Sequence, residues 1–215
     1  MEKTINGLYI ITPAINPAIQ NTHIDRHYEN LRRDVEFALQ GGASVVQYRD
    51  KSTDRLRRLN EAGELLALCN HYDATFIIND DVELAAAIAA HGVHLGGDDV
   101  PLPEARRRLG AEAIIGASCY NRLDLAVRAQ QQSADYVAFG RFFPSRTKPQ
   151  AVQADVELLR QAKRQLSVPI VAIGGITAQN GAQLVAAGAD MLAVVAAVFS
   201  HHDITAAARR LLQCF

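Results

Sequence analysis

Cationic and amide side chains follow a short apolar run early in the chain. Gln47 and Arg49 are two residues apart, so the alternation of a β-strand would place both on one face, with Lys51 just beyond them. Burying an amide or a guanidinium without a partner is costly, so these groups are expected to bind a ligand. The alternative is an internal ion pair with Asp50 or Asp80.

Carboxylates follow the next two apolar runs. Asn79 and Asp80 come directly after one run, Asp98 and Asp99 follow the other, and Asp81 is placed to cap the helix that comes next. Oxygen donors on neighbouring strands, without cysteine or paired histidine ligands, suit Mg²⁺ better than zinc. Magnesium commonly keeps water and substrate phosphate oxygens among its ligands, so this pattern points to phosphate chemistry.

Two later segments have the composition of a phosphate site. The stretch 140–149 contains Ser145, Thr147 and Lys148, whose hydroxyl and ammonium groups can donate to phosphate oxygens. A solvated turn is the alternative interpretation of this stretch. The Gly-Gly pair at 174–175 precedes a predicted helix, where glycine lets an anion approach unpaired backbone N–H groups.

These segments belong to a repeating pattern of short Val- and Ile-rich runs and longer stretches with helical periodicity. Strands are predicted at 8–12, 44–49, 75–78, 92–95, 113–116, 136–140, 169–174 and 191–195. Helices are predicted at 26–40, 53–71, 82–90, 102–109, 122–132, 155–165, 178–187 and 198–212. Strands joined by helices must be parallel, and eight successive units favour an α/β fold, the closed (β/α)₈ or TIM barrel. An open doubly wound sheet is the alternative.

No linker or low-complexity segment divides the 215 residues, so we expect one domain over 1–215. The net charge of −1 and the aromatic content of 6% argue against nucleic acid or an anionic membrane as partner. Three scattered cysteines and the lack of a signal pattern or a bilayer-length apolar run favour a soluble cytoplasmic protein. In a TIM barrel the reacting groups gather at the carboxyl ends of the strands, which would bring the polar segments together.

Six segments, in order and spanning nearly the whole chain, resemble the thiamine-phosphate synthase (thiamine-phosphate pyrophosphorylase) family. They are LYIIT at 8–12, QYRDK at 47–51, NDD at 79–81, GVHLG at 92–96, SRTK at 145–148 and IGGIT at 173–177. The resemblance implies a barrel transferase that uses Mg²⁺ to join 4-amino-2-methyl-5-pyrimidinylmethyl diphosphate to a thiazole phosphate, carboxylated or not. The products would be thiamine phosphate and pyrophosphate, formed through a dissociative pyrimidine carbocation. The partners implied are phosphorylated small molecules, and a homo-oligomer is left open.

The resemblance also implies roles for individual residues. Those that would bind the two substrates are Gln47 and Ser118 for the aminopyrimidine, Arg49, Lys51, Asn79 and Lys148 for the diphosphate, and Ser145, Thr147, Gly175, Val195 and Ala196 for the thiazole phosphate. Arg49, Lys51 and Lys148 would be catalytic, through stabilisation of the leaving pyrophosphate. Asp80 and Asp99 would hold Mg²⁺.

The chain departs from the family pattern at Arg141, where proline is usual, and at Gly97, Ser145 and Ala196, where glutamine, threonine and serine are usual. Two other functions compete with the synthase. A thiazole tautomerase would share the barrel without needing a diphosphate clamp, and a non-catalytic regulator would only bind thiamine phosphate.

Two further residues are interpreted without reference to a ligand. His94 lies inside a predicted strand and is expected to be a satisfied core histidine rather than a ligand. Cys119 is expected at the mouth of the barrel, but no helper base accompanies it, so a nucleophilic role is not assigned.

Overall fold

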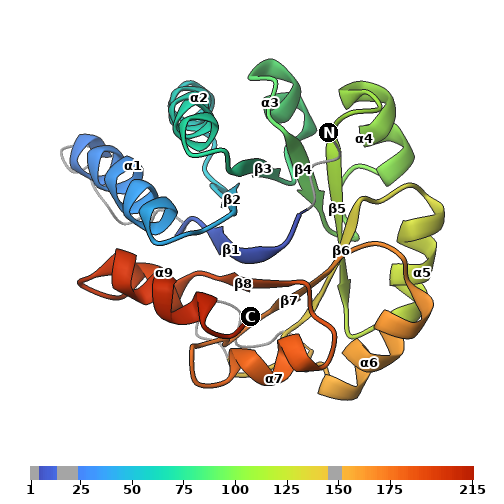
Figure 1. Ribbon diagram of the computed structural model, residues 1–215. Helices are drawn as coiled ribbons and strands as arrows, with labels where there is room; N and C mark the ends of the chain where they lie inside the picture. Colours follow the sequence, from blue (N-terminus) through green and yellow to red (C-terminus); the bar gives the residue numbers. More distant parts are fainter. Residues whose placement is uncertain (1–4, 14–23, 145–151) are drawn as a thin grey trace.

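The computed structural model describes residues 5–13, 24–144 and 152–215. Eight parallel strands close into a barrel in chain order, and the helices lie outside it (Figure 1). Closure occurs where β8 pairs with β1, with Leu192 beside Leu8, so the sheet has no free edge. The predicted (β/α)₈ barrel is confirmed, and the open sheet is excluded.

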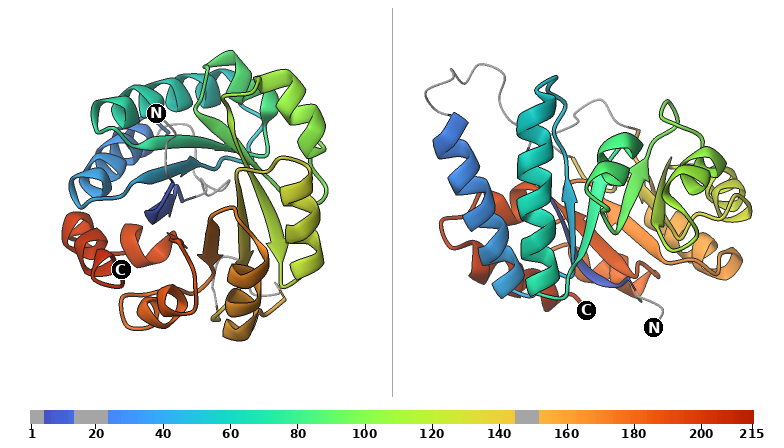
Figure 2. Two further views of the ribbon diagram at one scale, coloured as in Figure 1. Left: turned by 45° about the vertical axis from the view of Figure 1, so that its right-hand side comes forward. Right: turned by 90° about the horizontal axis from the view of Figure 1, so that it is seen from above.

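The elements alternate regularly along the chain. The strands are β1 (Gly7–Ile11), β2 (Val45–Tyr48), β3 (Thr75–Asn79), β4 (Gly92–Leu95), β5 (Ile114–Tyr120), β6 (Tyr136–Gly140), β7 (Ile170–Ile173) and β8 (Met191–Val194). The helices are α1 (Ile24–Gln40), α2 (Arg55–His71), α3 (Val82–Ala87), α4 (Leu102–Leu109), α5 (Leu123–Gln131), α6 (Val156–Gln165), α7 (Gly181–Ala186), α8 (Ala196–Phe199) and α9 (Ile204–Leu212). Helices next to each other in the chain, such as α1 and α2, lie side by side around the barrel (Figure 2).

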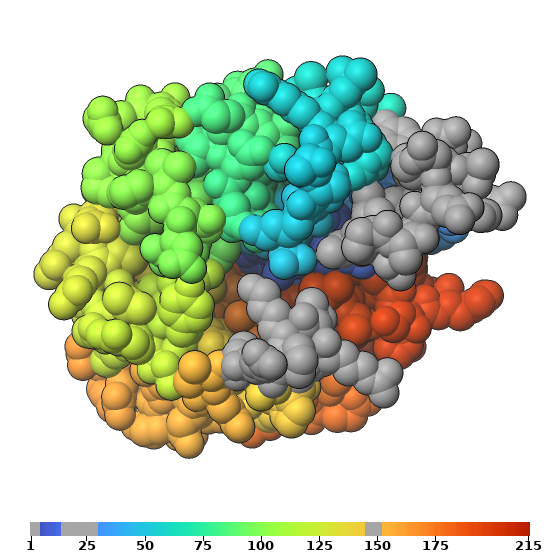
Figure 3. Space-filling model, turned by 180° about the vertical axis from the view of Figure 1, so that it is seen from behind, coloured from blue at the N-terminus to red at the C-terminus, as the bar shows by residue number. Residues whose placement is uncertain are grey.

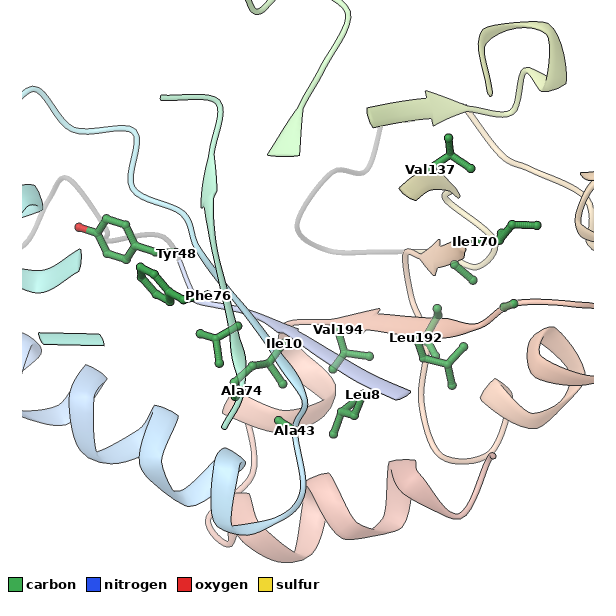
Figure 4. Close-up of a cluster of buried hydrophobic side chains, with 14 of the residues drawn as sticks. Leu8, Ile10, Ala43, Tyr48, Ala74, Phe76, Val137, Ile170, Leu192 and Val194 are labelled. Carbon is green, nitrogen blue, oxygen red and sulfur yellow. The ribbon is translucent and has the colours of Figure 1, made fainter. Parts of the chain in front are cut away.

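Alternation along each strand creates two hydrophobic cores. Leu8 and Ile10 point outward and pack with Phe76, Leu192 and other buried side chains between the barrel and its helices (Figure 4). Tyr9 points the other way, into a smaller core inside the barrel. Because parallel strands of a barrel are covered on both faces, nearly every strand residue is buried.

Four predicted elements differ from the structure by three residues or more. The helix predicted at 82–90 ends at Ala87, as α3. The single helix predicted at 198–212 is two helices, because Asp203 accepts a hydrogen bond from the backbone N–H of Ala206 and starts α9 afresh. The strand predicted at 113–116 continues to Tyr120 as β5. The helix predicted at 178–187 begins only at Gly181, after a turn in which the Asn180 side chain accepts from the Thr177 N–H.

Cys119 is also misplaced by the sequence prediction. It lies on β5 with 1% of its surface exposed, not at the mouth of the barrel, and burial raises the pKa of its thiol to about 12. A buried neutral thiol is a poor nucleophile, which supports leaving Cys119 out of the chemistry. Within the described residues, no helix is both long and apolar enough to cross a membrane.

Candidate active site

A cavity of about 400 Å³ opens inside the barrel, toward the ends of the strands. Residues from each of the eight strands contribute to its lining. Seen from the side opposite to Figure 1, successive parts of the chain follow one another around the molecule (Figure 3). The polar segments singled out from the sequence therefore converge, as expected for the carboxyl end of this fold.

The cavity has a polar half and a glycine-rich half. The polar half is formed by β2 to β5 and their ends, with the side chains of Gln47, Arg49, Asn79, His94, Ser118 and Tyr120. The opposite half comes from the ends of β6, β7 and β8 and is lined by Gly140, Ile173, Gly174, Gly175, Val195 and Ala196, among others. Two chemically different groups can thus bind opposite each other.

Arg49 provides a cation at the polar half. Its backbone N–H donates to the Thr12 hydroxyl at 2.9 Å, which ties the end of β2 to the end of β1. Among the side chains that the structure describes, at 5–13, 30–144 and 152–215, no carboxylate forms an ion pair with the Arg49 guanidinium. The internal ion pair considered from the sequence therefore does not apply to Arg49, whose charge can serve an anionic ligand.

Lys51 and Asp80 do form that ion pair, just outside the cavity. Both line an adjoining hollow of about 350 Å³, which shares Asn79 with the larger cavity. Asp80 has a left-handed backbone, with φ of 64°, which aspartate tolerates better than most residues. Burial opposes ionisation of Asp80, but bonds from Lys51 and Asp99 outweigh it, so the pKa of Asp80 lies below its ordinary value.

Asp99, the second residue implied for the metal, lies against Asp80. It accepts a hydrogen bond from the Gly96 N–H at 2.7 Å. Burial and the adjacent Asp80 carboxylate raise the pKa of Asp99. Two carboxylates in contact need a cation or a shared proton, and one or two carboxylates are what Mg²⁺ takes from a protein when phosphate supplies further oxygens. The donor set of Asp80 and Asp99 fits this ion.

The glycine pair after β7 is fixed by its neighbours. Gly174 and Gly175 have φ values of 102° and 65°, in the left-handed region that favours glycine. A Cβ on Gly175 would lie only 2.4 Å from the Pro144 carbonyl oxygen, so the pair also holds the segment after β6. Beyond β8, Val195 precedes α8 and Ala196 begins it, where the first N–H groups lack intrahelical acceptors.

Three predicted phosphate-binding residues, Ser145, Thr147 and Lys148, lie outside the described residues.

The predicted helix cap is confirmed, because Asp81 accepts from the Leu84 N–H at 2.9 Å. Asp50, which follows the same strand as Arg49, turns away from the cavity and pairs with Arg57.

Two buried tyrosines, Tyr9 and Tyr136, were missed from the sequence, and they connect residues that the sequence had singled out. The Gln47 Nε2 donates to the Tyr9 hydroxyl at 2.7 Å, and the hydroxyls of Tyr9 and Tyr136 are 2.9 Å apart. The Tyr136 hydroxyl lies 3.0 Å from His94 Nδ1, and His94 Nε2 lies 2.8 Å from Ser118 Oγ. His94 is thus buried and satisfied, as predicted, but it also lines the cavity. The alternation that places Gln47 inside the barrel could have revealed Tyr9 and Tyr136, which face inward by the same rule.

Comparison with known proteins agrees with the family that the sequence resembles. A family model described as thiamine monophosphate synthase matches residues 17–198. Thiamine-phosphate synthase of Thioalkalivibrio sulfidiphilus is 53% identical over 211 residues, which cover 98% of this chain and 96% of that protein. The protein of the same name from Nitrosococcus oceani is 51% identical over 215 residues, covering 100% of this chain and 95% of that protein.

Solved structures show the same relationship. Thiamine phosphate pyrophosphorylase from Pyrococcus furiosus has a TM-score of 0.82 and 32% identity, over 97% of this chain and 95% of that chain. A 3-hexulose-6-phosphate synthase, with a TM-score of 0.68, 14% identity and coverage of 98% and 100%, shares only the fold. Because the family match covers most of the chain and two relatives exceed 50% identity along nearly its whole length, this protein is a transferase belonging to the thiamine monophosphate synthase family.

Proposed function

We propose that the protein joins 4-amino-2-methyl-5-pyrimidinylmethyl diphosphate to a thiazole phosphate, forming thiamine phosphate and pyrophosphate. The observation that carries this proposal is the division of the cavity. One half offers the Arg49 guanidinium and the Gln47 and Asn79 amides, with Lys51 and Asp80 in the adjoining hollow. The other half offers glycine and helix-end backbone, together with Arg141. A diphosphate ester and a second phosphorylated ring need opposite halves of this kind.

The polar half would bind the pyrimidine diphosphate. Gln47 and Ser118 would contact the aminopyrimidine ring, because both side chains line the inner end of the cavity. Arg49 and Asn79 line the same half nearer the strand ends, and Lys51 lies in the adjoining hollow. Their donors would hold the diphosphate, with Lys148 assigned here by its position in the family pattern.

The glycine-rich half would bind the thiazole phosphate. Gly175, Val195 and Ala196 line it, and backbone N–H groups at the start of α8 are suited to phosphate oxygens. Ser145 and Thr147 would add hydroxyl donors, as the family pattern implies. In this arrangement the thiazole nitrogen would face the pyrimidine methylene across the cavity.

Asp80 and Asp99 would hold Mg²⁺ together with diphosphate oxygens. When bound, the ion would offset charge that accumulates on the leaving group. Lys51 now pairs with Asp80 and would exchange this partner for the diphosphate, which needs only a side-chain movement because 56% of the Lys51 side chain is exposed. The positive charges of Lys51 and Mg²⁺ would then face the negative charge of the bound diphosphate.

The reaction would be dissociative. The bond between the pyrimidine methylene and the diphosphate oxygen breaks, and its electron pair leaves with pyrophosphate, which Arg49 and Lys51 stabilise. The resulting cation is captured by the lone pair of the thiazole nitrogen, which forms the new carbon–nitrogen bond. No protein nucleophile takes part, in keeping with the burial and high pKa of the Cys119 thiol.

The direct test is to mix the purified protein with both substrates and Mg²⁺ and to follow thiamine phosphate by mass spectrometry. Product that disappears with a chelator and returns with added Mg²⁺ is expected. No product from folded protein that binds both substrates would contradict the proposal. A tautomerase would then be tested by isomerisation of the thiazole phosphate alone, and a regulator by binding of thiamine phosphate without turnover.

A further inference from the structure

Four buried side chains and the partly buried Ser118 form one continuous series of hydrogen bonds inside the barrel. It runs from Gln47 through Tyr9, Tyr136 and His94 to Ser118, with distances of 2.7, 2.9, 3.0 and 2.8 Å. Gln47 and Ser118, at its two ends, are the residues assigned above to the aminopyrimidine ring. We propose that Tyr9, Tyr136 and His94 are positioning residues that fix which hydrogen-bonding groups Gln47 and Ser118 present to the cavity.

The series has a direction, which follows from the donor at its first bond. The Gln47 Nε2 can only donate, so the Tyr9 hydroxyl accepts there. Tyr9 is 1% exposed, and within the described part of the chain its hydroxyl has no partner besides Gln47 and Tyr136. Its own proton must therefore go to the Tyr136 oxygen, since a buried donor is costly to leave unpaired.

The same reasoning continues to the other end. Tyr136 accepts from Tyr9, and within the described residues its own proton has no acceptor besides His94 Nδ1, so it donates there. A neutral imidazole that accepts at Nδ1 carries its proton on Nε2, and this proton is donated to Ser118 Oγ. The hydroxyl proton of Ser118 then remains available to a ligand.

Packing keeps the three middle residues in place. Gly116 lies between His94 and Tyr136 in the strand register, and a Cβ there would come within 2.0 Å of the Tyr136 ring. The rings of His94 and Tyr136 stack at 5.5 Å, and the Tyr9 ring meets Tyr136 edge-on at 6.1 Å. Rings held this closely cannot rotate far, so their polar atoms keep their partners.

The consequence is a fixed donor and acceptor pattern on the cavity wall. The Gln47 carbonyl oxygen is left to accept, and the Ser118 hydroxyl is left to donate. A 4-aminopyrimidine edge has an amino donor beside a ring-nitrogen acceptor, which complements this pattern. A 4-oxo ring has the reverse pattern, and binding it would require the Gln47 amide to turn over and every bond of the series to reverse. The series would thus select the amino ring over the oxo ring.

This inference rests on the proposed function, so the test measures binding and turnover separately. Dissociation constants of the 4-amino pyrimidine diphosphate and its 4-oxo counterpart are measured by calorimetry for the full chain and for Tyr136→Phe. The variant keeps the ring but cuts the series in the middle. The preference for the amino compound is expected to fall about tenfold, the effect of roughly one hydrogen bond. Affinity for the thiazole phosphate should stay within about twofold, because its half of the cavity is untouched.

Two further variants separate positioning from general damage. Tyr9→Phe cuts the series at another point, and because one series cannot be cut twice, the double variant should lose little more than either single variant. Tyr72→Phe is the matched control, since its hydroxyl bonds with Gln40 and Glu36 outside the barrel. It should leave the preference unchanged.

The outcomes distinguish the two proposals. An unchanged amino-over-oxo preference in folded Tyr136→Phe and Tyr9→Phe would overturn the positioning role, whatever the turnover. Equal losses of affinity for both pyrimidines and for the thiazole phosphate would also overturn it, because they would indicate structural damage. Absence of turnover in the unaltered protein would overturn the proposed function, whereas the binding preference would still test the series.

Discussion

Two charged clusters begin at neighbouring residues, Asp50 and Lys51, and differ in how deeply they are buried. Asp50 turns outward to the Arg57 guanidinium, which also binds Glu61 at 2.8 Å, and Tyr48 donates to the same Glu61. Lys51 turns to the mouth of the barrel and meets Asp80. We call these the outer cluster (Tyr48, Asp50, Arg57 and Glu61) and the mouth cluster (Lys51, Asp80 and Asp99).

Exposure separates the clusters. In the outer cluster the side chains of Asp50, Arg57 and Glu61 are 4%, 11% and 1% exposed. In the mouth cluster Lys51 and Asp80 are 56% and 23% exposed, and in both clusters two carboxylates share one cation. A cluster whose groups are buried and bonded to one another has little left to offer a ligand, whereas the exposed mouth cluster can still bind one. The outer cluster should therefore determine stability and the mouth cluster activity.

The largest expected effect is on stability, from Arg57→Met. Removing the guanidinium leaves Asp50 and Glu61 buried without their cation, which costs about 3–5 kcal/mol of unfolding free energy. Urea unfolding measures this loss. The control is Arg160→Met, which removes a surface pair with Glu157 and should cost less than about 1 kcal/mol. Similar losses in the two variants would contradict the distinction between buried and exposed clusters.

Activity is expected to respond next, to Lys51→Met. Loss of one cation that stabilises the leaving pyrophosphate should lower kcat/KM about 100-fold, with less than about 1 kcal/mol lost in stability. Lys163→Met is a close control, because Lys163 pairs with Asp190 at 2.6 Å and is 50% exposed. A Lys51 variant with nearly normal turnover would show that its ion pair with Asp80 is structural, the alternative interpretation of the sequence.

The fold and part of the candidate site could be predicted from the sequence, each for its own reason. Strand positions follow from local apolar runs, and the end of each strand in a barrel has a known location, so Arg49 and Asp80 could be assigned to the site. The opposite orientations of Asp50 and Lys51 were not predicted, since alternation is lost once a strand ends. The partners of Asp50 lie on the next helix, and the contacts that select them are tertiary.

The hydrogen-bond series inside the barrel also depends on tertiary contacts that the sequence does not reveal. Tyr9 and Tyr136 are 127 positions apart, and each is an unremarkable aromatic residue in an apolar strand. Only closure of the barrel brings their hydroxyls together. The role of Gly116 is also tertiary, because the space beside it is filled by the Tyr136 ring from the neighbouring strand.

The smallest expected effect is on how steeply the unfolding free energy falls at acid pH. It tests the contribution of Asp50 to the outer cluster. Burial raises the pKa of Asp50, but the Ser52 N–H and Arg57 outweigh it, so the folded pKa lies below the ordinary 3.8. A depressed folded pKa contributes stability that is present above 3.8 and is lost as pH falls through the folded value. The unfolding free energy should therefore fall less steeply below pH 4 in Asp50→Asn than in the unaltered protein.

The difference cannot exceed about 1.4 kcal/mol per pH unit, the slope set by one proton. Urea unfolding at several pH values between about 2 and 5 measures it. Asp50→Asn keeps an oxygen that can accept from the Ser52 N–H, so the fold should persist while the charge is gone. If the unfolding free energy falls equally steeply with pH in the two proteins, the Asp50 carboxylate is no better stabilised in the folded than in the unfolded state. The outer cluster would then owe its contribution to Glu61 and Arg57, and the comparison between the clusters would rest on that pair alone.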